Sequence, residues 1–354
     1  MTDDPRLKTR ITELFGVRYP IVQTGMGWVA NSHLAAATSN AGGLGIIAAA
    51  PMTFAQMKQA IAEVQAATDK PFGVNLRTDA VDIDARVDYV IKVKVKVASF
   101  AQAPGEAVVK KLKDAGVVVM PTIGARRHAE KVAAWGVDAV IAQGAEGGGH
   151  TGVIPTSILI PQVLDAVDIP VLVAGGVYDG RGLAAALACG ADGIAMGTRF
   201  LMSSDSAVPA HVKQIYLDTP LTGTVVTKAI DGAPQRVIRT KLIDELERAK
   251  FLAFPKAFSN ALKFRKLTST SYRDLLKEGL AMKKSQDLSW AQLALAANAP
   301  MLTKATLVDG HPEVGILPTG QGVGAIDTLQ SCQEIIDLCV QQAIERLDHL
   351  CRKQ

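Results

Sequence analysis

The sequence predicts an α/β protein, a (β/α)₈ TIM barrel of parallel strands with a smaller, mostly helical domain inserted before the C-terminal return. The first observation is that short apolar, β-branched runs alternate with Ala-rich stretches of helical periodicity, many of which end in Gly. Continuous apolar strands between amphipathic helices are typical of a parallel sheet covered by helices. The second is that eight such runs fit into about 180 residues, which favours a closed barrel over an open doubly wound sheet.

The expected elements follow one another in a regular order. The eight strands are expected at 20–24, 43–48, 72–76, 97–100, 117–123, 139–143, 170–176 and 193–197. Helices are expected between them at 33–42, 53–68, 104–116, 125–136, 158–167 and 179–190, and a last helix at 331–350. After Phe200 the rhythm breaks and no clear strand alternation remains, which predicts a mostly helical excursion over the barrel. We therefore expect a barrel over 1–212, a substrate (lid) domain over 213–290 and a return to the barrel over 291–354.

Charge and composition narrow the function classes. The chain has a net charge of only +4, so nucleic acid is not an expected partner. The residues 236–284 nevertheless carry 13 Lys and Arg against 5 Asp and Glu, which suggests an anionic ligand or a solvated helix face. No apolar run of about 18 residues could span a bilayer, and the N-terminus lacks the apolar core of a signal peptide. The spacing of the four cysteines fits neither a zinc site nor a disulfide framework, so we expect a cytoplasmic protein. Cys332 and Cys339 lie seven residues apart on a predicted helix, and we expect both to pack on one face of it.

The active site of such a barrel lies at the carboxyl ends of its strands, and the residues there are chemically distinctive. They are Gln23, Thr24, Gly25, Met26, Asn75, Thr122, Gln143, Ala174, Gly175, Gly176, Met196, Gly197 and Thr198. The Gly residues after the seventh and eighth strands stand where barrels bind a phosphate through main-chain N–H groups. The segment GGVYDGRG then opens a helix whose N-terminal dipole favours an anion. Amide side chains with this phosphate site suit FMN, although Asn75 and Gln143 could equally bond neighbouring backbone.

The loop QGAEGGGHTG, residues 143–152, places one imidazole among five glycines after the sixth strand. Of the six histidines, His150 lies beside the expected cofactor, which indicates a catalytic or substrate-orienting role. Glu146 either orients this histidine or braces the loop. The sequence has no Ser-His-Asp or Cys-His arrangement, no HExxH, and no GxGxxG after the first strand. Hydrolase, zinc-enzyme and Rossmann interpretations are therefore disfavoured, and no metal is expected.

Taken together, these motifs resemble the nitronate monooxygenase (2-nitropropane dioxygenase) family. The resemblance rests on QTGMGWVA (23–30), NAGGLGIIAA (40–49), PFGVNLR (71–77), QGAEGGGHTG, VAGGVYDGRG (173–182) and ADGIAMGTRF (191–200), and it runs from about residue 8 to the C-terminus. It implies an FMN-dependent barrel whose flavin contacts Gln23, Gly25, Met26, Asn75, Gln143, Gly175, Gly176, Gly197 and Thr198. It also implies that His150 is the active-site histidine, with the glycines of its loop, Gly148 and Gly149 among them, lying flat beside the flavin.

One departure bears on the substrate. Several nitronate-oxidising members carry Lys where this chain has Thr122, and the chain looks closer to the branch that acts on a hydrindane-carboxyl-CoA in steroid ring C/D breakdown. The resemblance to that branch implies hydride transfer between a CoA thioester and flavin N5. NADH or NADPH is a candidate co-substrate, and a homodimer is a candidate assembly. The candidates for the CoA phosphates are Arg236, Arg239, Lys241, Lys263, Arg265 and Lys266. The alternatives are a nitronate monooxygenase, an enoyl-thioester or NAD(P)H:quinone reductase, and an FMN barrel that docks an acyl carrier.

Overall fold

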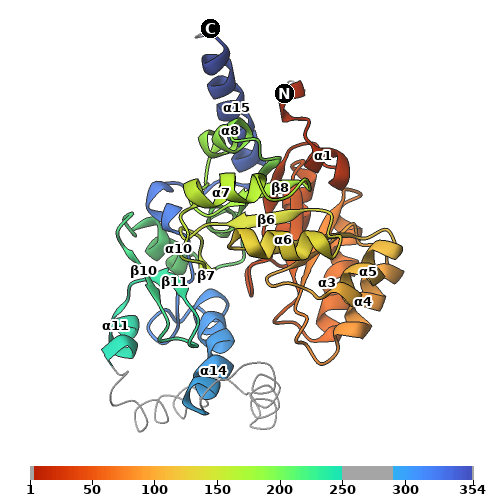
Figure 1. Cartoon of the computed structure of the whole chain (residues 1–354). Coiled ribbons are helices and arrows are strands. Elements are labelled where there is room, and N and C mark those ends of the chain that lie inside the picture. Colours follow the sequence, from red (N-terminus) through yellow and green to blue (C-terminus); the bar gives the residue numbers. More distant parts are fainter. Residues whose placement is uncertain (1–3, 249–289, 353–354) are drawn as a thin grey trace.

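The protein forms the closed parallel barrel that the sequence predicts, as seen in a computed structural model that describes residues 4–248 and 290–352 (Figure 1). Neighbouring strands follow the order β1-β2-β3-β4-β5-β6-β8-β9, and β9 pairs with β1 to close the ring. The barrel strands are β1 (Ile21–Gln23), β2 (Leu44–Ala48), β3 (Phe72–Leu76), β4 (Val97–Phe100), β5 (Val118–Ile123), β6 (Val140–Gln143), β8 (Val171–Ala174) and β9 (Gly193–Met196). All eight predicted strands are confirmed.

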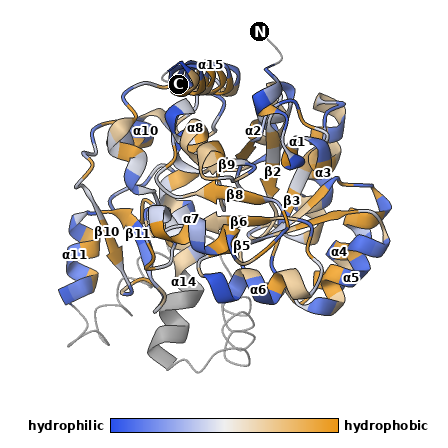
Figure 2. Ribbon diagram, turned by 45° about the horizontal axis from the view of Figure 1, so that its top comes forward, coloured by the Kyte–Doolittle hydropathy of each residue, from blue (hydrophilic) through white to orange (hydrophobic). Residues whose placement is uncertain are grey.

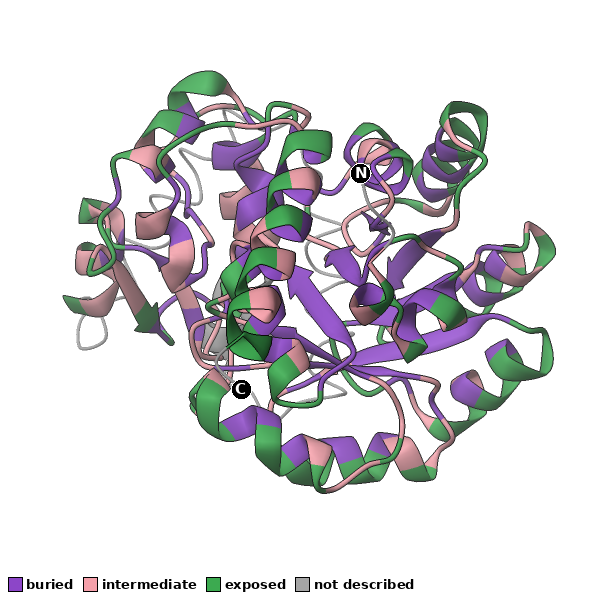
Figure 3. Cartoon of the chain, turned by 90° about the horizontal axis from the view of Figure 1, so that it is seen from above, coloured by how far each residue is buried: buried purple, intermediate pink, exposed green. Residues whose placement is uncertain are grey.

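Helices cover the outside of the barrel, with buried residues on the faces that pack against the strands and exposed residues outward (Figure 3). They are α2 (Ser32–Asn40), α3 (Phe54–Ala67), α4 (Ile83–Lys92), α5 (Glu106–Asp114), α6 (Arg126–Ala134), α7 (Thr156–Leu164), α8 (Gly180–Ala188) and the short α9 (Thr198–Leu201). The predicted helices are confirmed, and α4 is an addition that the sequence analysis missed. The C-terminal helix α15 (Cys332–Cys351) begins at a Ser331 capping box and packs on α8 and α2.

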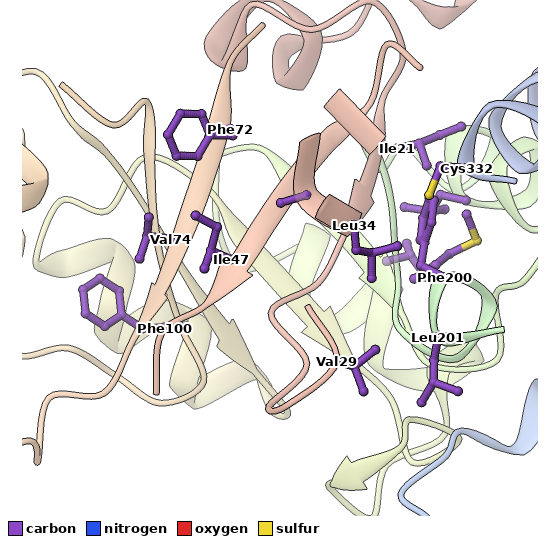
Figure 4. Close-up of a cluster of buried hydrophobic side chains, with 14 of the residues drawn as sticks. Ile21, Val29, Leu34, Ile47, Phe72, Val74, Phe100, Phe200, Leu201 and Cys332 are labelled. Atoms are coloured by element: carbon purple, nitrogen blue, oxygen red, sulfur yellow. The ribbon is translucent and has the colours of Figure 1, made fainter. Parts of the chain in front are cut away.

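The core has two layers, one inside the barrel and one between the strands and the helices. Inside, strand residues such as Val22 and Ile141 cluster with Ile11 and Phe15 of α1 (Arg10–Phe15), which closes the amino end of the barrel. The outer layer includes Ile47, Phe72, Val74 and Phe100 (Figure 4). Apolar residues accordingly fill the strands, and polar residues line the outer helix faces (Figure 2). Cys332 and Cys339 are buried in this layer, as their shared helix face predicts.

A second, antiparallel sheet of three strands lies beside the barrel, in the order β10-β11-β7 (Figure 1). Its strands are β10 (Thr224–Thr227), β11 (Gln235–Ile238) and β7 (Gly149–His150). The sequence analysis found no clear strand alternation after Phe200 and expected a mostly helical excursion, so the strands β10 and β11 are additions to that prediction. β10 and β11 come from the inserted domain, whereas β7 is part of the glycine-rich loop after β6. The sheet thus ties the inserted domain to the loop that carries His150.

The remaining described elements surround this sheet. They are η1 (Pro5–Leu7), α10 (Ala210–Leu217), α11 (Lys241–Arg248), α14 (Trp290–Leu307) and η3 (Gln321–Ala325). A small apolar cluster joins the sheet to these helices through Ile230, Val237, Ile243, Ala299 and Ile316. The domain limits at 213 and 290 stay a prediction, because residues 249–289 lie outside the described part of the chain. In the described ranges, no helix combines the length and apolarity that crossing a membrane requires.

Candidate functional site

The carboxyl ends of the strands bring the predicted residues together in one ring. Thr24 after β1 donates its main-chain N–H to Met196 O at the end of β9, at 3.1 Å. Gly25 lies so close to Asn75 of β3 that a Cβ on it would stand 2.4 Å from the Asn75 Cβ. On the other side, Gln143 of β6 pairs in register with Ala174 of β8. Residues from five strands of the barrel therefore border the same end.

The three amide side chains make hydrogen bonds within the protein. Gln23 is fully buried, and its amide exchanges hydrogen bonds of 3.2 and 3.3 Å with the main chain of Ile46 on β2. The Asn75 Nδ2 donates to Ser99 Oγ at 3.3 Å, and the Gln143 Nε2 donates to His150 O at 2.9 Å. Gln23 and Gln143 thus bond to neighbouring main-chain groups, which is the alternative that the sequence analysis left open for Gln143. The side-chain oxygens of Asn75 and Gln143 can still accept a hydrogen bond.

The glycines of the loop after β6 are explained by close packing. A Cβ on Gly147 would stand 2.6 Å from the Gln143 Nε2, and one on Gly148 would stand 2.4 Å from Gly320 N in the segment that returns to the barrel. Gly149 has a φ of +64°, which favours glycine. The loop therefore lies flat between its own strand and the return segment, and larger residues would push it away from both.

The ends of β8 and β9 provide a glycine-lined main-chain surface. Gly175 and Gly176 follow one another with φ of +89° and +76°. A Cβ on Gly175 would meet Gly144 O at 2.9 Å, and Thr198 Oγ1 accepts from Gly320 N at 2.8 Å. Among the described residues, no protein group accepts a hydrogen bond from the main-chain N–H of Gly176, Gly197 or Thr198. N–H groups in this arrangement suit the oxygens of a phosphate.

The helix that follows these glycines does not provide the expected anion site. The N-cap of α8 is Asp179, whose carboxylate accepts from the N–H groups of Arg181 and Gly182. The N–H of Gly180 donates to Gln342 Oε1 at 3.0 Å. A carboxylate already satisfies the positive end of this helix, so the prediction that it favours an external anion is wrong. Any phosphate contact rests on the glycines before the helix.

His150 lies on β7 and is held by the inserted domain. Its Nε2 is 2.8 Å from Asp231 Oδ2 and 3.3 Å from Gln235 Nε2, and Gln235 is its register partner on β11. The His150 side chain is 66% exposed, whereas that of Asp231 is 10% exposed. Burial alone would raise the pKa of the Asp231 carboxyl, but hydrogen bonds from His150, Ala233 and Gln235 and the charge of His150 outweigh it, and the pKa lies below its ordinary value.

The carboxylate beside His150 was not found from the sequence. Glu146, the nearby candidate, instead accepts from Thr156 N at 3.0 Å and from Thr156 Oγ1 at 2.7 Å. It braces the loop, which is the second role that the sequence analysis allowed. Asp231 lies 81 residues from His150 along the chain. A local pattern around the histidine therefore carries no signal for it.

The basic residues that were predicted to bind the CoA phosphates lie in different environments. The Arg236 guanidinium is half-buried and donates to Ala145 O at 3.0 and 3.3 Å and to Thr224 Oγ1 at 2.9 Å, so it secures the glycine-rich loop. Burial lowers its pKa. Arg239 is exposed and pairs with Asp244 at 2.8 Å, and Lys241 is exposed. The other three candidates, Lys263, Arg265 and Lys266, lie outside the described residues.

Thr122 is the remaining predicted position. Thr122 lies near the end of β5, half-buried, and pairs in register with Ile141 of β6. Within residues 4–248 and 290–352, no group of three His, Cys, Asp or Glu side chains could hold a metal ion.

Known proteins resemble this chain along almost its whole length. The chain matches the family described as nitronate monooxygenase over residues 8–85 and 78–342. It is 55% identical over 345 residues, 97% of this chain and 98% of the relative, to the (3aS,4S,5R,7aS)-5-hydroxy-7a-methyl-1-oxo-octahydro-1H-indene-4-carboxyl-CoA dehydrogenase of Rhodococcus jostii.

Two solved structures extend the comparison. FabK from Thermotoga maritima is 34% identical, with a TM-score of 0.82 over 98% of this chain and 99% of that one. The nitroalkane oxidase from Streptomyces ansochromogenes is 28% identical, with a TM-score of 0.76 over 96% and 99%. The resemblance inferred from the motifs is confirmed, and relatives named as dehydrogenase and oxidase make the protein an oxidoreductase. The chain belongs to the nitronate monooxygenase family.

Proposed function

We propose that this oxidoreductase uses FMN to dehydrogenate a CoA thioester, or to run the reverse reduction, with His150 as the residue that moves the substrate proton. The observation that carries the proposal is the place of His150. Its imidazole is exposed, lies at the carboxyl end of the barrel and is fixed by a buried carboxylate. An imidazole held in this way suits general acid–base catalysis.

The residues present fit FMN. Gly175, Gly176, Gly197 and Thr198 would hold the phosphate, because main-chain N–H groups there are open to it and the paired glycines have positive φ angles that favour glycine. Asn75, Thr122 and Gln143 would face the ring system, with Met26 beside Gly197. Gln23, Thr24, Gly25, Ala174, Met196, Gly148 and Gly149 would support these contacts through backbone position. When bound, FMN would supply the acceptor for a hydride.

The protein's own contribution is to bind the thioester and manage its proton. A thioester acidifies the hydrogen on its α-carbon, so loss of that proton to His150 accompanies loss of a hydride from the β-carbon. The products are an α,β-unsaturated thioester and a protonated imidazole. Donors at the strand ends that face the thioester oxygen would stabilise the negative charge that develops on it. The loop glycines keep His150 close enough for this, because larger residues would displace the loop.

A CoA thioester is favoured as the substrate on two grounds. The relative from Rhodococcus jostii, 55% identical over nearly the whole chain, is named as a dehydrogenase of an indene-carboxyl-CoA. Thr122 stands where several nitronate-oxidising members carry a Lys, which removes a cation from beside the flavin. Arg239 and Lys241 are exposed near β11 and are the described candidates for the phosphates of CoA. Arg236 is assigned to the loop instead, because its guanidinium already donates to Ala145 O.

Oxidation of alkyl nitronates by oxygen is the second candidate function. It is favoured by the family that the chain matches and by the likeness to a nitroalkane oxidase at 28% identity. In that reaction His150 would bind or deprotonate a small anionic substrate, and the exposed cations of the inserted domain would have no substrate phosphate to bind. That difference makes the two functions separable by experiment.

The test is reduction of the bound flavin without oxygen. The purified protein is mixed anaerobically with a hydrindane-carboxyl-CoA ester, and separately with the free acid, while the visible flavin absorbance is recorded. We expect bleaching by the ester only, and NADH or NADPH are added in parallel to test them as reductants. Equal bleaching by ester and acid would remove the role of CoA. Oxygen uptake with propionate 3-nitronate, together with no response to the ester, would establish the second function instead.

A further inference from the structure

We propose that Asp231 and Gln235 of the inserted domain are positioning residues that hold His150 with its hydrogen on Nε2, so that Nδ1 is the atom that takes the substrate proton. This inference deepens the proposed function and rests on it for the role of His150 as a base. The arrangement of the three side chains does not depend on which substrate the protein uses.

The contacts of Asp231 require this tautomer. Its Oδ2 lies 2.8 Å from the His150 Nε2 and also accepts a hydrogen bond from the Gln235 side-chain amide. Its Oδ1 accepts from Ala233 N at 3.1 Å. An ionised carboxylate can only accept hydrogen bonds, so the imidazole nitrogen that contacts it must carry the hydrogen. A neutral imidazole has one N–H, and the lone pair is consequently on Nδ1.

The surroundings of Asp231 favour the ionised form of its carboxyl group, as this tautomer requires. It is 10% exposed and receives three hydrogen bonds, and these donors outweigh the burial that would otherwise favour its neutral form. The charged groups nearby do not compete for it. Arg236, which follows Gln235 on β11, directs its guanidinium at Ala145 O and Thr224 Oγ1, and the Glu146 carboxylate accepts hydrogen bonds from Thr156.

The main chain aligns the three side chains in advance. His150 and Gln235 are direct partners in the antiparallel pair of β7 and β11, and Thr151 N donates to Pro234 O at 3.1 Å. The Nε2 edge of the ring faces Asp231, while the side chain as a whole stays 66% exposed. Gln235 Nε2 lies 3.3 Å from the His150 Nε2 but, as a donor beside a donor, makes no hydrogen bond to it in this tautomer; it acts through Asp231, to whose Oδ2 it donates. Nδ1 is thus the nitrogen left open to a substrate. The barrel supplies the base, and the inserted domain determines which of its nitrogens is basic.

Nitrogen NMR on ¹⁵N-histidine-labelled protein with its flavin tests the proposal without substrate. The His150 signals are identified by their loss in His150→Ala. We expect the wild-type ring to carry hydrogen on Nε2, and Asp231→Asn to give a mixture of tautomers or a ring protonated on Nδ1. Asp231→Glu, which retains a carboxylate, should keep the wild-type tautomer. Asp244→Asn is the matched control, since it removes an inserted-domain carboxylate that pairs with Arg239 rather than with His150.

Kinetics give the second readout. In Asp231→Asn we expect flavin reduction at saturating CoA ester to fall on the order of 10²- to 10⁴-fold, with KM little changed, and Asp231→Glu to recover much of the rate. A wild-type ring protonated on Nδ1, or an unchanged tautomer in a folded Asp231→Asn variant, would overturn the proposal. If wild-type flavin is not reduced by any CoA ester, the proposed function fails, and the tautomers of the two variants still decide the role of Asp231.

Discussion

At the scale of single residues, the surroundings of His150 are set by Asp231, whose carboxylate lies 2.8 Å from the imidazole Nε2, and by Gln235, its partner on β11. His150 could be chosen among six histidines because it follows a predicted strand in a loop of glycines. Its partners Asp231 and Gln235 reach it through a sheet that forms only when distant segments pair. Glu146 was the nearest acid in sequence, but its carboxylate turns to Thr156. Proximity along the chain is therefore a poor guide to which carboxylate contacts this histidine.

The close approach of Gly25 to Asn75 at the carboxyl ends of the strands can be tested by substitution. A Cβ at this position would stand 2.4 Å from the Asn75 Cβ and 2.9 Å from its Cγ. Gly25→Ala should displace Asn75, lower the free energy of unfolding by about 1–3 kcal/mol and weaken retention of FMN. Thermal unfolding and the flavin content after dialysis measure both effects.

Gly27→Ala is the matched control for this substitution. It lies two residues along the same loop, and an added Cβ would meet nothing within 4 Å. We expect stability and flavin content close to those of the wild type. If the two variants behave alike in both measurements, the close approach of Gly25 to Asn75 has no energetic importance.

At the scale of elements, the barrel strands were predictable and the strands of the small sheet were not. Each barrel strand is a continuous apolar run because both of its faces are buried. The strands β10 and β11 are not buried throughout, since three of the four β10 residues and Arg236 of β11 are partly or fully exposed, and β7 has two residues inside a glycine-rich loop. The continuous buried run that marks a barrel strand is therefore absent from them. The helix α4 was missed because it has few buried residues and one of them, Arg86, is charged; the others are Val87 and Val90.

Arg236 provides the element-scale prediction, because it joins β11 to the loop that carries His150. In Arg236→Met, the Ala145 carbonyl loses donors at 3.0 and 3.3 Å, which should cost about 1–3 kcal/mol of unfolding free energy. We expect faster amide hydrogen exchange in residues 143–152, measured by mass spectrometry, because the loop loses its clamp.

The control for the Arg236 variant is Arg239→Met, three residues further along the chain. Arg239 forms an exposed ion pair with Asp244, and such pairs contribute about 0–1 kcal/mol. Exchange in the loop should stay as in the wild type. Equal exchange in the two variants would show that the guanidinium of Arg236 does not hold the loop.

At the scale of the whole molecule, the candidate site combines residues at the carboxyl ends of the barrel strands with Asp231 and Gln235 of the inserted domain, which contact His150. The family resemblance was visible because its motifs lie at those strand ends, where the fold requires glycine and small polar residues. The predicted anion site at the start of α8 failed because its own Asp179 caps the helix, a contact that the dipole argument ignored. The three basic candidates between 263 and 266 lie outside the described residues and stay a prediction.

The central claim is that His150 serves proton transfer and not cofactor binding, and His150→Ala tests it most directly. The imidazole is exposed and its contacts are to Asp231 and Gln235, so its removal should leave the strand ends and the glycines intact. The measurement is anaerobic flavin reduction by the CoA ester, with bound flavin quantified in the same samples. We predict wild-type flavin content and a rate lower on the order of 10²-fold or more. Loss of the flavin, or reduction at the wild-type rate, would contradict the account.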